Sequence, residues 1–340
     1  MIKKLFVCFW VLLSATSYGQ LGGQSTYQFL NLIPSPRQAA LGGKVFTNLD
    51  YDVTQALSNP STINLDMDNQ LAVNYSSYLA GISYGTAAYG YTYDRRNQTF
   101  FAGITYINYG QFEGYDEQGI ATGSFTGNEA ALSIGHARQV GYSDFYLGGT
   151  LKLITSKLEQ YTSFGVAIDA GLLYLNEDIE FQATLVVRNF GTQVTTYAGV
   201  NERLPFEVAF GMSQTLENVP IRWHLTFDNL QQWPIGRPNP ARAETDLEGN
   251  QTQEKITFFG QVIRHTIIGA EVFPEGGFQI RIGYSFRRAE ELRIIDQRNF
   301  SGLSAGISIK LNRMRFSYSH AKYASAANAN FFGLQIDLDN

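Results

Sequence analysis

The sequence predicts an all-β protein: a transmembrane antiparallel β-barrel of about 14 strands with an N-terminal hatch in its lumen. Three observations favour this fold. From Leu71 onward, apolar and polar side chains alternate with a period of two, which is the period of a strand. Short and long connections alternate between these segments. After the first twenty residues, no apolar stretch approaches the roughly 20 residues that a membrane-spanning helix needs.

Residues 1–19 have the order of a secretory signal peptide, and we expect cleavage between Gly19 and Gln20. Lys3 and Lys4 supply the positive charge, and an unbroken apolar run follows them. That run is about half as long as the roughly 20 residues of a membrane-spanning helix. Its length disfavours the alternative of an uncleaved helical anchor and predicts that the protein is exported.

The chemistry of the mature chain excludes several classes of protein. The cysteine Cys8 lies inside the predicted signal, so we expect neither a disulfide framework nor a thiolate metal site. The chain has 25 basic and 30 acidic residues, and removing Lys3 and Lys4 leaves 23 against 30. This mildly acidic balance argues against nucleic acid as a partner. No residue pattern predicts a cofactor.

Segments with strand alternation fill the expected barrel domain, residues 70–340. Near the C-terminus, Leu303 and Ile307 fall on one face, and Ser304 and Ser308 fall on the other. Most segments run about 10–13 residues, which suits a tilted strand crossing a bilayer better than a soluble strand of about 5–6. The segments are 70–79, 82–93, 99–109, 127–139, 143–157, 161–175, 179–190, 204–216, 221–231, 262–273, 278–288, 301–311, 313–320 and 330–338.

The connections between these segments are an independent test. Short and long links alternate, except that the links after the first and fifth segments are too short for the pattern. Bacterial outer-membrane barrels combine short periplasmic turns, long outer loops and an even strand number, so this parity predicts periplasmic ends. Strand length and loop parity disfavour a soluble β-sandwich or a β-solenoid. The long links are 110–126, 191–203, 232–261, 289–300 and 321–329.

The segment 20–69 lacks long alternation and contains two Gly-Gly pairs and three prolines. We interpret it as a hatch within the lumen, because wall side chains alone do not fill a barrel of this size. Residues 35–40 are expected to form a helical turn with Pro36 at its first position. Residues 52–58 are expected to form another, ended by the proline at position 60. A mobile periplasmic tail is the alternative.

No arrangement of residues predicts catalysis, and we expect no enzyme activity, no cofactor-binding residue and no metal site. Residues 81–85 match the G-x-S-x-G pattern of serine hydrolases, which needs a strand, a sharp turn and a helix around the serine. An alternating run follows Ser83 instead of a helix. The histidines fall in predicted strands, and none of them has the spacing of a helical metal site. They are His136, His224, His265 and His320.

A set of polar side chains falls on the predicted inward faces of the strands. In an open barrel such residues line an ion or substrate path, whereas in a plugged barrel they pair with each other and with the plug. The mixed signs and the many inward Gly, Ser and Ala residues favour pairing. The set is Lys152, Asp169, Glu207, Arg222, His224, Asp228, Arg281, Arg287, Lys310 and Arg315.

The connection 232–261 is the candidate functional site. It is too long for a bare connection, and long loops in compact domains are usually functional or disordered. It combines an aromatic residue with charges of both signs, and we interpret it as a surface that contacts a partner protein. The candidate contact residues are Trp233, Arg237, Arg242, Glu244, Asp246 and Glu248.

Several stretches carry a resemblance to a known family. The mature chain resembles the PorQ family, outer-membrane barrels of the type IX secretion system of Bacteroidota, within the wider group of PorV- and FadL-like barrels. The stretch ALSNPS also resembles the A-x-x-N-P-A element in the hatch of FadL-type transporters, with Ser61 in place of the final alanine. The matching stretches are GGQSTYQFLNLIPSPRQAALGG (22–43), ALSNPS (56–61), NYSSYLAGISYG (74–85), FFAGITYINYGQFEGYDEQG (100–119) and SKLEQYTSFGVAIDAGLLY (156–174).

This resemblance implies a FadL-like 14-stranded barrel that anchors an attachment complex at the cell surface. The implied protein partners are PorZ, PorU and PorV, with outer-membrane lipid and lipopolysaccharide around them. That complex processes secreted cargo and attaches it to lipopolysaccharide, and the barrel itself carries no catalytic residue. The alternative is a FadL-like transporter of hydrophobic small molecules. An enzyme of the outer-membrane phospholipase kind is disfavoured because no Ser-His pair lies on suitable strands.

Overall fold

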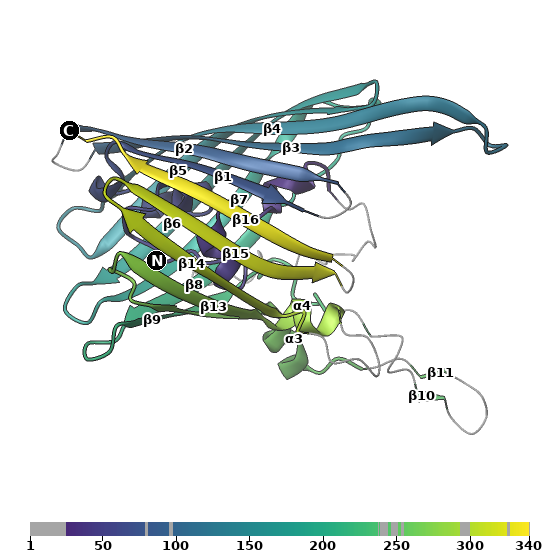
Figure 1. Ribbon diagram of the computed structural model, residues 1–340. Helices are drawn as coiled ribbons and strands as arrows, with labels where there is room; N and C mark the ends of the chain where they lie inside the picture. The colour runs from purple at the N-terminus through teal and green to yellow at the C-terminus, as the bar shows by residue number, and fades with distance from the viewer. Residues whose placement is uncertain are drawn as a thin grey trace, which may run out of the picture.

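The computed structural model shows a closed β-barrel whose lumen contains the N-terminal segment (Figure 1). It describes residues 25–78, 81–94, 98–236, 238, 244–245, 251–252, 255–292, 300–324 and 327–339. The predicted signal peptide therefore lies outside the described residues. Within them, no helix is both long enough and apolar enough to cross a membrane.

Fourteen antiparallel strands form the closed sheet, which confirms the predicted fold class. Neighbours in sequence pair around the barrel, and the ring closes where β1 pairs with β16. The strands are β1 (Gln70–Ser77), β2 (Ser83–Asp94), β3 (Gln98–Tyr115), β4 (Ala121–Gln139), β5 (Phe145–Leu158), β6 (Tyr161–Asn176), β7 (Phe181–Thr195), β8 (Glu207–Thr215), β9 (Ile221–Phe227), β12 (Thr266–Val272), β13 (Phe278–Ser285), β14 (Leu303–Leu311), β15 (Met314–Ala324) and β16 (Ala327–Asp337).

The wall has the alternation expected from the sequence. In β13, Ile280 and Ile282 are 41% and 48% exposed on the outside, whereas Gln279 and Arg281 are buried on the inside. A closed sheet satisfies its backbone hydrogen bonds internally, and the apolar outer face matches the needs of a strand in lipid.

Helices replace the expected strand or loop at two places on the rim. Residues 262–265, predicted as strand, end helix α3 (Phe258–His265), because the Thr257 hydroxyl caps the helix by accepting from Gly260 N at 3.2 Å. Residues 286–288, also predicted as strand, begin helix α4 (Phe286–Glu291), which Ser285 caps. Capping of the first free N–H groups explains why alternation does not continue here.

Two connections predicted to be long are shorter than expected. β3 and β4 extend to Tyr115 and from Ala121, so most of the predicted loop 110–126 is a two-stranded ribbon. Figure 1 shows this ribbon running past the ends of the other strands. The predicted loop 321–329 is also mostly strand, because β15 and β16 pair almost to their ends.

The two ends of the barrel differ. Short turns join the strands at the end where β1 begins and where Leu338 N donates to Asn69 O at 2.9 Å. The opposite end carries the β3–β4 ribbon, helices α3 and α4, and the small sheet β10–β11 (Glu244–Thr245 and Gln251–Thr252) (Figure 1). We call this opposite end the outer mouth, following the loop pattern of outer-membrane barrels.

The N-terminal segment, residues 25–69, fills the lumen and we call it the hatch. It begins at the outer mouth, where Thr26 N donates to Arg203 O at 2.9 Å. Both expected helical turns are present, and their caps are Ser35 and Asp52, which accept from the backbone. The turns of the hatch are η1 (Gln28–Asn31), α2 (Pro36–Ala40), η2 (Val53–Leu57), η3 (Pro60–Thr62) and η4 (Leu65–Met67).

Candidate functional site

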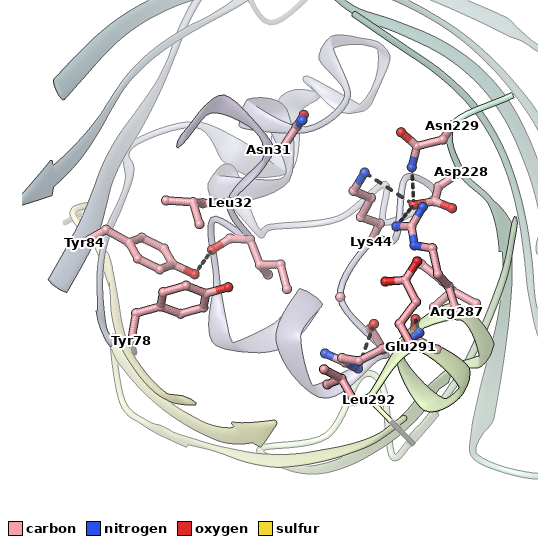
Figure 2. Close-up of a pocket in the computed structure, with 16 residues that line it drawn as sticks. Asn31, Leu32, Lys44, Tyr78, Tyr84, Asp228, Asn229, Arg287, Glu291 and Leu292 are labelled. Carbon is pink, nitrogen blue, oxygen red and sulfur yellow. Dashed lines mark hydrogen bonds and ion pairs between the residues drawn. The ribbon is translucent and has the colours of Figure 1, made fainter. Parts of the chain in front are cut away.

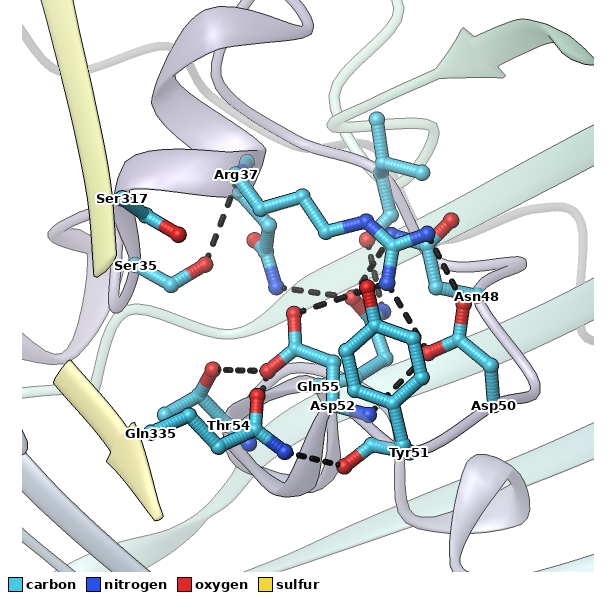
Figure 3. Close-up of polar contacts among 12 residues, drawn as sticks. Ser35, Arg37, Asn48, Asp50, Tyr51, Asp52, Thr54, Gln55, Ser317 and Gln335 are labelled. Atoms are coloured by element: carbon cyan, nitrogen blue, oxygen red, sulfur yellow. Dashed lines mark hydrogen bonds and ion pairs between the residues drawn. The ribbon is translucent and has the colours of Figure 1, made fainter. Parts of the chain in front are cut away.

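A buried cluster of ion pairs joins the hatch to the wall, and Figure 3 shows its hatch side around Arg37 and Asp50. Arg37, on α2, donates to both carboxylate oxygens of Glu271 at 2.9 Å and to Asp50 at 2.8 Å. From the wall, Arg281 Nε donates to Glu271 Oε1 at 2.6 Å, and Arg222 lies 3.4 Å from Asp50. Bidentate pairing fixes the geometry of a guanidinium against a carboxylate. The cluster therefore holds α2 against β12 and β13 in one register.

The pKa values of the two hatch carboxylates, Asp50 and Asp52, shift in opposite directions. Burial works to raise the pKa of Asp50, but the Arg37 guanidinium outweighs it, so the pKa lies below its usual value. Burial raises the pKa of Asp52, and Arg37 lies farther from this carboxylate, at 3.8 Å. Asp52 instead caps η2 by accepting from Thr54 N at 3.1 Å. Asp50 thus contributes to the ion pairs, while Asp52 mainly shapes the local turn.

A second cluster joins the hatch to the wall closer to the outer mouth. Lys44 pairs with Glu207 and lies 3.4 Å from Asp228. Arg188 donates to Glu207 at 3.0 Å, and Arg287 donates to Asp228 at 2.8 Å. Each buried charge has an opposite partner, which offsets the large cost of removing an ion from water. As predicted, these inward wall residues pair with each other and with the plug.

The remaining predicted inward residues also contact partners in the wall or the hatch, except for Lys310. Lys152 pairs with Asp169 at 2.6 Å, entirely within the wall. The Arg315 guanidinium lies 4.4 Å from the centre of the Tyr51 ring of the hatch. Lys310 shares the inward face of β14 with Ser304 and Ser308 and lies opposite Arg315, as predicted, but its side chain is exposed because it lies beside the short turn that ends the strand.

Glycines in the wall allow the hatch backbone to approach the strands directly. A Cβ on Gly283 would lie 2.0 Å from the carbonyl carbon of Leu41, and one on Gly148 would lie 2.2 Å from Pro60 O. Gly149, the next residue in β5, points outward, and its Cβ would meet nothing closer than 3.8 Å. The inward glycines are therefore contact positions rather than empty lumen.

The ALSNPS stretch lies at the centre of the hatch, where Asn59 is fully buried. Its side chain donates to Phe46 O at 2.7 Å and to Thr184 Oγ1 at 3.0 Å. It also accepts from Ser61 N at 3.0 Å, which caps η3. One amide thus ties two parts of the hatch to strand β7 and satisfies its own buried polar atoms.

Sequence reasoning missed the hatch half of these clusters. Arg37, Lys44 and Asp50 lie in an irregular segment, which has no periodicity to show which side chains are buried. The sequence did show charged residues in the predicted hatch and charged residues on the predicted inward faces of the wall. The presence of both sets indicates that hatch and wall charges pair, but it does not identify which residues are partners.

A cavity of about 370 Å³ lies between the hatch and the wall at the outer mouth. Figure 2 shows its two sides: aromatic and aliphatic side chains face a charged side. On the first side Tyr84 donates to Ile33 O at 3.0 Å, and on the second Lys44 and Arg287 meet Asp228. Two other cavities between hatch and wall measure only about 20 Å³ each. Space of that size holds about one water molecule.

The candidate contact loop has an ordered base at the outer mouth. The Trp233 ring stacks on His265 with centroids 5.2 Å apart and lies equally close to Phe258. Phe258 and Phe259, on α3, are 63% and 76% exposed, so the base presents aromatic surface outward. Of the other candidate residues, Glu244 lies in β10. Outside the described residues lie Arg237, Arg242, Asp246 and Glu248.

The serine of the G-x-S-x-G pattern and the histidines lie in surroundings that do not form a catalytic arrangement in the described residues. Ser83 starts strand β2, which continues as strand rather than turning into a helix. His224 lies 3.3 Å from Glu271 inside the first cluster, and His136 stacks on Phe100. His265 ends α3, so its predicted place in a strand is wrong. In the part of the chain that the structure describes, no group of metal-binding side chains is suited to a metal ion.

Comparisons with known proteins return solved structures alone: no family model and no curated protein matches the sequence. The chain is similar to the crystal structure of a Pseudomonas aeruginosa FadL homologue, with 10% identity, a TM-score of 0.47, and coverage of 90% of this chain and 98% of that one. It is also similar to CdiB from Acinetobacter baumannii, with 10% identity, a TM-score of 0.36, and coverage of 78% of this chain and 59% of that one. For a KdgM porin the identity is 6%, the TM-score is 0.35, and the coverage is 79% of this chain and 99% of that one.

The architecture itself defines the class of protein. A closed antiparallel sheet with apolar side chains outside and a polar, filled lumen is the architecture of a bacterial outer-membrane barrel. The chain is therefore an outer-membrane β-barrel protein whose lumen contains its own N-terminal hatch.

Proposed function

We propose that this protein is a non-enzymatic, PorQ-like component of the type IX secretion system that anchors the attachment complex at the cell surface. Its expected protein partners are PorZ, PorU and PorV, with PorZ the main one. The observation that carries the proposal is the contrast between a lumen closed by buried ion pairs and an outer mouth with exposed aromatic surface. The sequence resemblance supplies the identity of the partners.

The loop between Gly236 and α3 gives a direct test. We expect that replacing residues 237–254 by a short Gly-Ser linker releases PorZ from the purified barrel. We expect Trp233 and α3 to stay in place in this variant, because the contact between Trp233 and His265 of α3 does not involve the removed segment. Heat-modifiable gel mobility is the control for insertion. Unchanged recovery of PorZ with a normally inserted variant would contradict the assignment of this loop.

A second candidate function is transport of hydrophobic small molecules, and the cavity at the outer mouth favours it. The cavity combines Tyr78 and Tyr84 with cationic side chains, which suits a small molecule with an apolar body and an anionic group. Transport also requires the hatch to move, since the cavities farther along it have room for about one water each. Fatty-acid uptake that is unaffected by loss of the gene would eliminate this function.

A further inference from the structure

The β3–β4 ribbon has two strand edges without a ladder partner. Pairing between β2 and β3 ends at Asn108, and pairing between β4 and β5 ends at Gly127. Beyond these points, residues 111–115 pair with residues 121–126 and with no other strand that the structure describes. Every second residue of such a strand directs its backbone N–H and C=O away from its partner. The ribbon therefore offers open edges to a third strand.

The ribbon is ordered as a projecting arm. Its five or six residues per strand, at about 3.3 Å each, extend it roughly 16–20 Å beyond the neighbouring strands. Phe112 and Phe125 stack across it with ring centroids 5.4 Å apart. At the tip, Asp116 accepts from Gln118 N at 3.0 Å and from Ile120 N at 2.7 Å. An isolated hairpin is only marginally stable in water, so this arm gains from an additional strand.

One face of the ribbon looks toward the space above the outer mouth. Along β4 the inward residues are Glu129 and Ala131, which are buried in the barrel. Phe125 has the same parity and lies on the same face of the strand, and Phe112 is its cross-strand partner. Both rings remain about 40% exposed, at 38% and 43%. A third strand added at either edge would continue the barrel wall beyond the neighbouring strands, with these two rings on the face toward the outer mouth.

The charge of the ribbon selects the kind of partner. Glu113, Asp116 and Glu117 are exposed, and no Lys, Arg or His occurs between Asn108 and Glu129. Like charge repels the phosphates of lipopolysaccharide, whereas opposite charge attracts a basic segment and speeds its encounter. Acidic side chains beside open backbone edges suit an extended strand that carries Lys or Arg.

We propose that the β3–β4 ribbon captures a basic, extended segment of a cell-surface protein by adding it as a third strand above the outer mouth. This proposal rests on the anchoring function proposed above and assigns part of the partner contact to a segment other than the 232–261 loop.

The test uses the full-length protein in intact outer membranes, with a photo-crosslinking residue at Ile120 or, separately, at Phe259. We expect the Ile120 probe to crosslink to a surface protein within a Lys- or Arg-rich segment. We expect the triple variant Glu113→Lys, Asp116→Lys, Glu117→Lys to reduce that product about tenfold. The matched control is Glu177→Lys, Asp178→Lys, Glu180→Lys, since these exposed acids occupy a short turn at the opposite end.

The outcomes separate the two proposals. If the Phe259 probe captures a surface protein while the Ile120 probe captures none and the ribbon variant changes nothing, the ribbon proposal is overturned and the anchor remains. Crosslinks from Ile120 to lipopolysaccharide only, or to a second copy of this chain only, also overturn it. If neither probe captures a surface protein, the anchoring function itself fails.

Discussion

The hatch and the outer mouth differ in which groups are buried and paired and which are exposed. Around the hatch, charged groups are buried and paired, and wall glycines meet its backbone, as with Glu271 and Gly148. At the outer mouth, aromatic side chains such as Phe259 are exposed and the ribbon edges are open. A region that is satisfied internally is built to stay closed, whereas a region with exposed apolar groups gains by binding something else. The difference supports the proposal that the lumen is structural and that partner recognition takes place at the surface.

Removing the shared carboxylate should have the largest effect. Glu271→Ala leaves Arg37 and Arg281 buried without their main partner, and we expect a loss of about 3–5 kcal/mol in the free energy of unfolding. Urea unfolding of the refolded barrel measures this loss. Glu217→Ala, in an exposed turn, is the control and should change little. A similar small loss for both variants would show that the lumen pairs do not hold the hatch.

Adjacent glycines of β5 give the next test. Gly148→Ala places a methyl group against the Pro60 carbonyl of the hatch, and we expect a loss of about 1–3 kcal/mol from overpacking. Gly149→Ala adds the same methyl group to the outer face, where space is open. Amide hydrogen exchange of residues 53–62 should rise in the first variant only. Equal exchange in the two variants would mean that the hatch does not contact this strand.

The acid sensitivity of the hatch should depend on Asp50. Its pKa lies below the usual value of about 3.9, so its ion pair stabilises the folded state above that value. The contribution is lost as the pH falls through the lowered folded-state pKa. We expect hydrogen exchange of the hatch to increase below about pH 3.9, and Asp50→Asn to weaken that dependence. Asp66→Asn, at an exposed site, should preserve it.

The exposed aromatic surface should contribute least to stability. Phe259→Ser removes a ring that is 76% exposed, and we expect a change within about 0.5 kcal/mol in the free energy of unfolding. Recovery of the surface partner should fall in the same variant. A large loss of stability with unchanged partner recovery would mean that this ring packs within the barrel and does not contact a partner.

The wall could be predicted from the sequence because alternation is local and repeats in every strand. Outward Ile280 and inward Arg281 are assigned by parity alone, and the helical turns at 35–40 and 52–58 follow from the prolines at positions 36 and 60. The pairing of Arg37 with Glu271 could not be predicted, because 234 positions separate the two residues and the hatch has no period. Helix α3 was not predicted either. The alternation from residue 262 onward predicted a strand there, so the cap at Thr257 was not recognised.

We propose that this closed barrel acts through its outer mouth by holding a surface protein. Crosslinking from Phe259, Ile120 and Ile179 in intact outer membranes tests it most directly, since the first two lie at the outer mouth and the third in a short turn at the opposite end. We expect the two outer probes to capture the same surface protein and the Ile179 probe not to capture it. Capture from Ile179 only, or from none of the three, would contradict it.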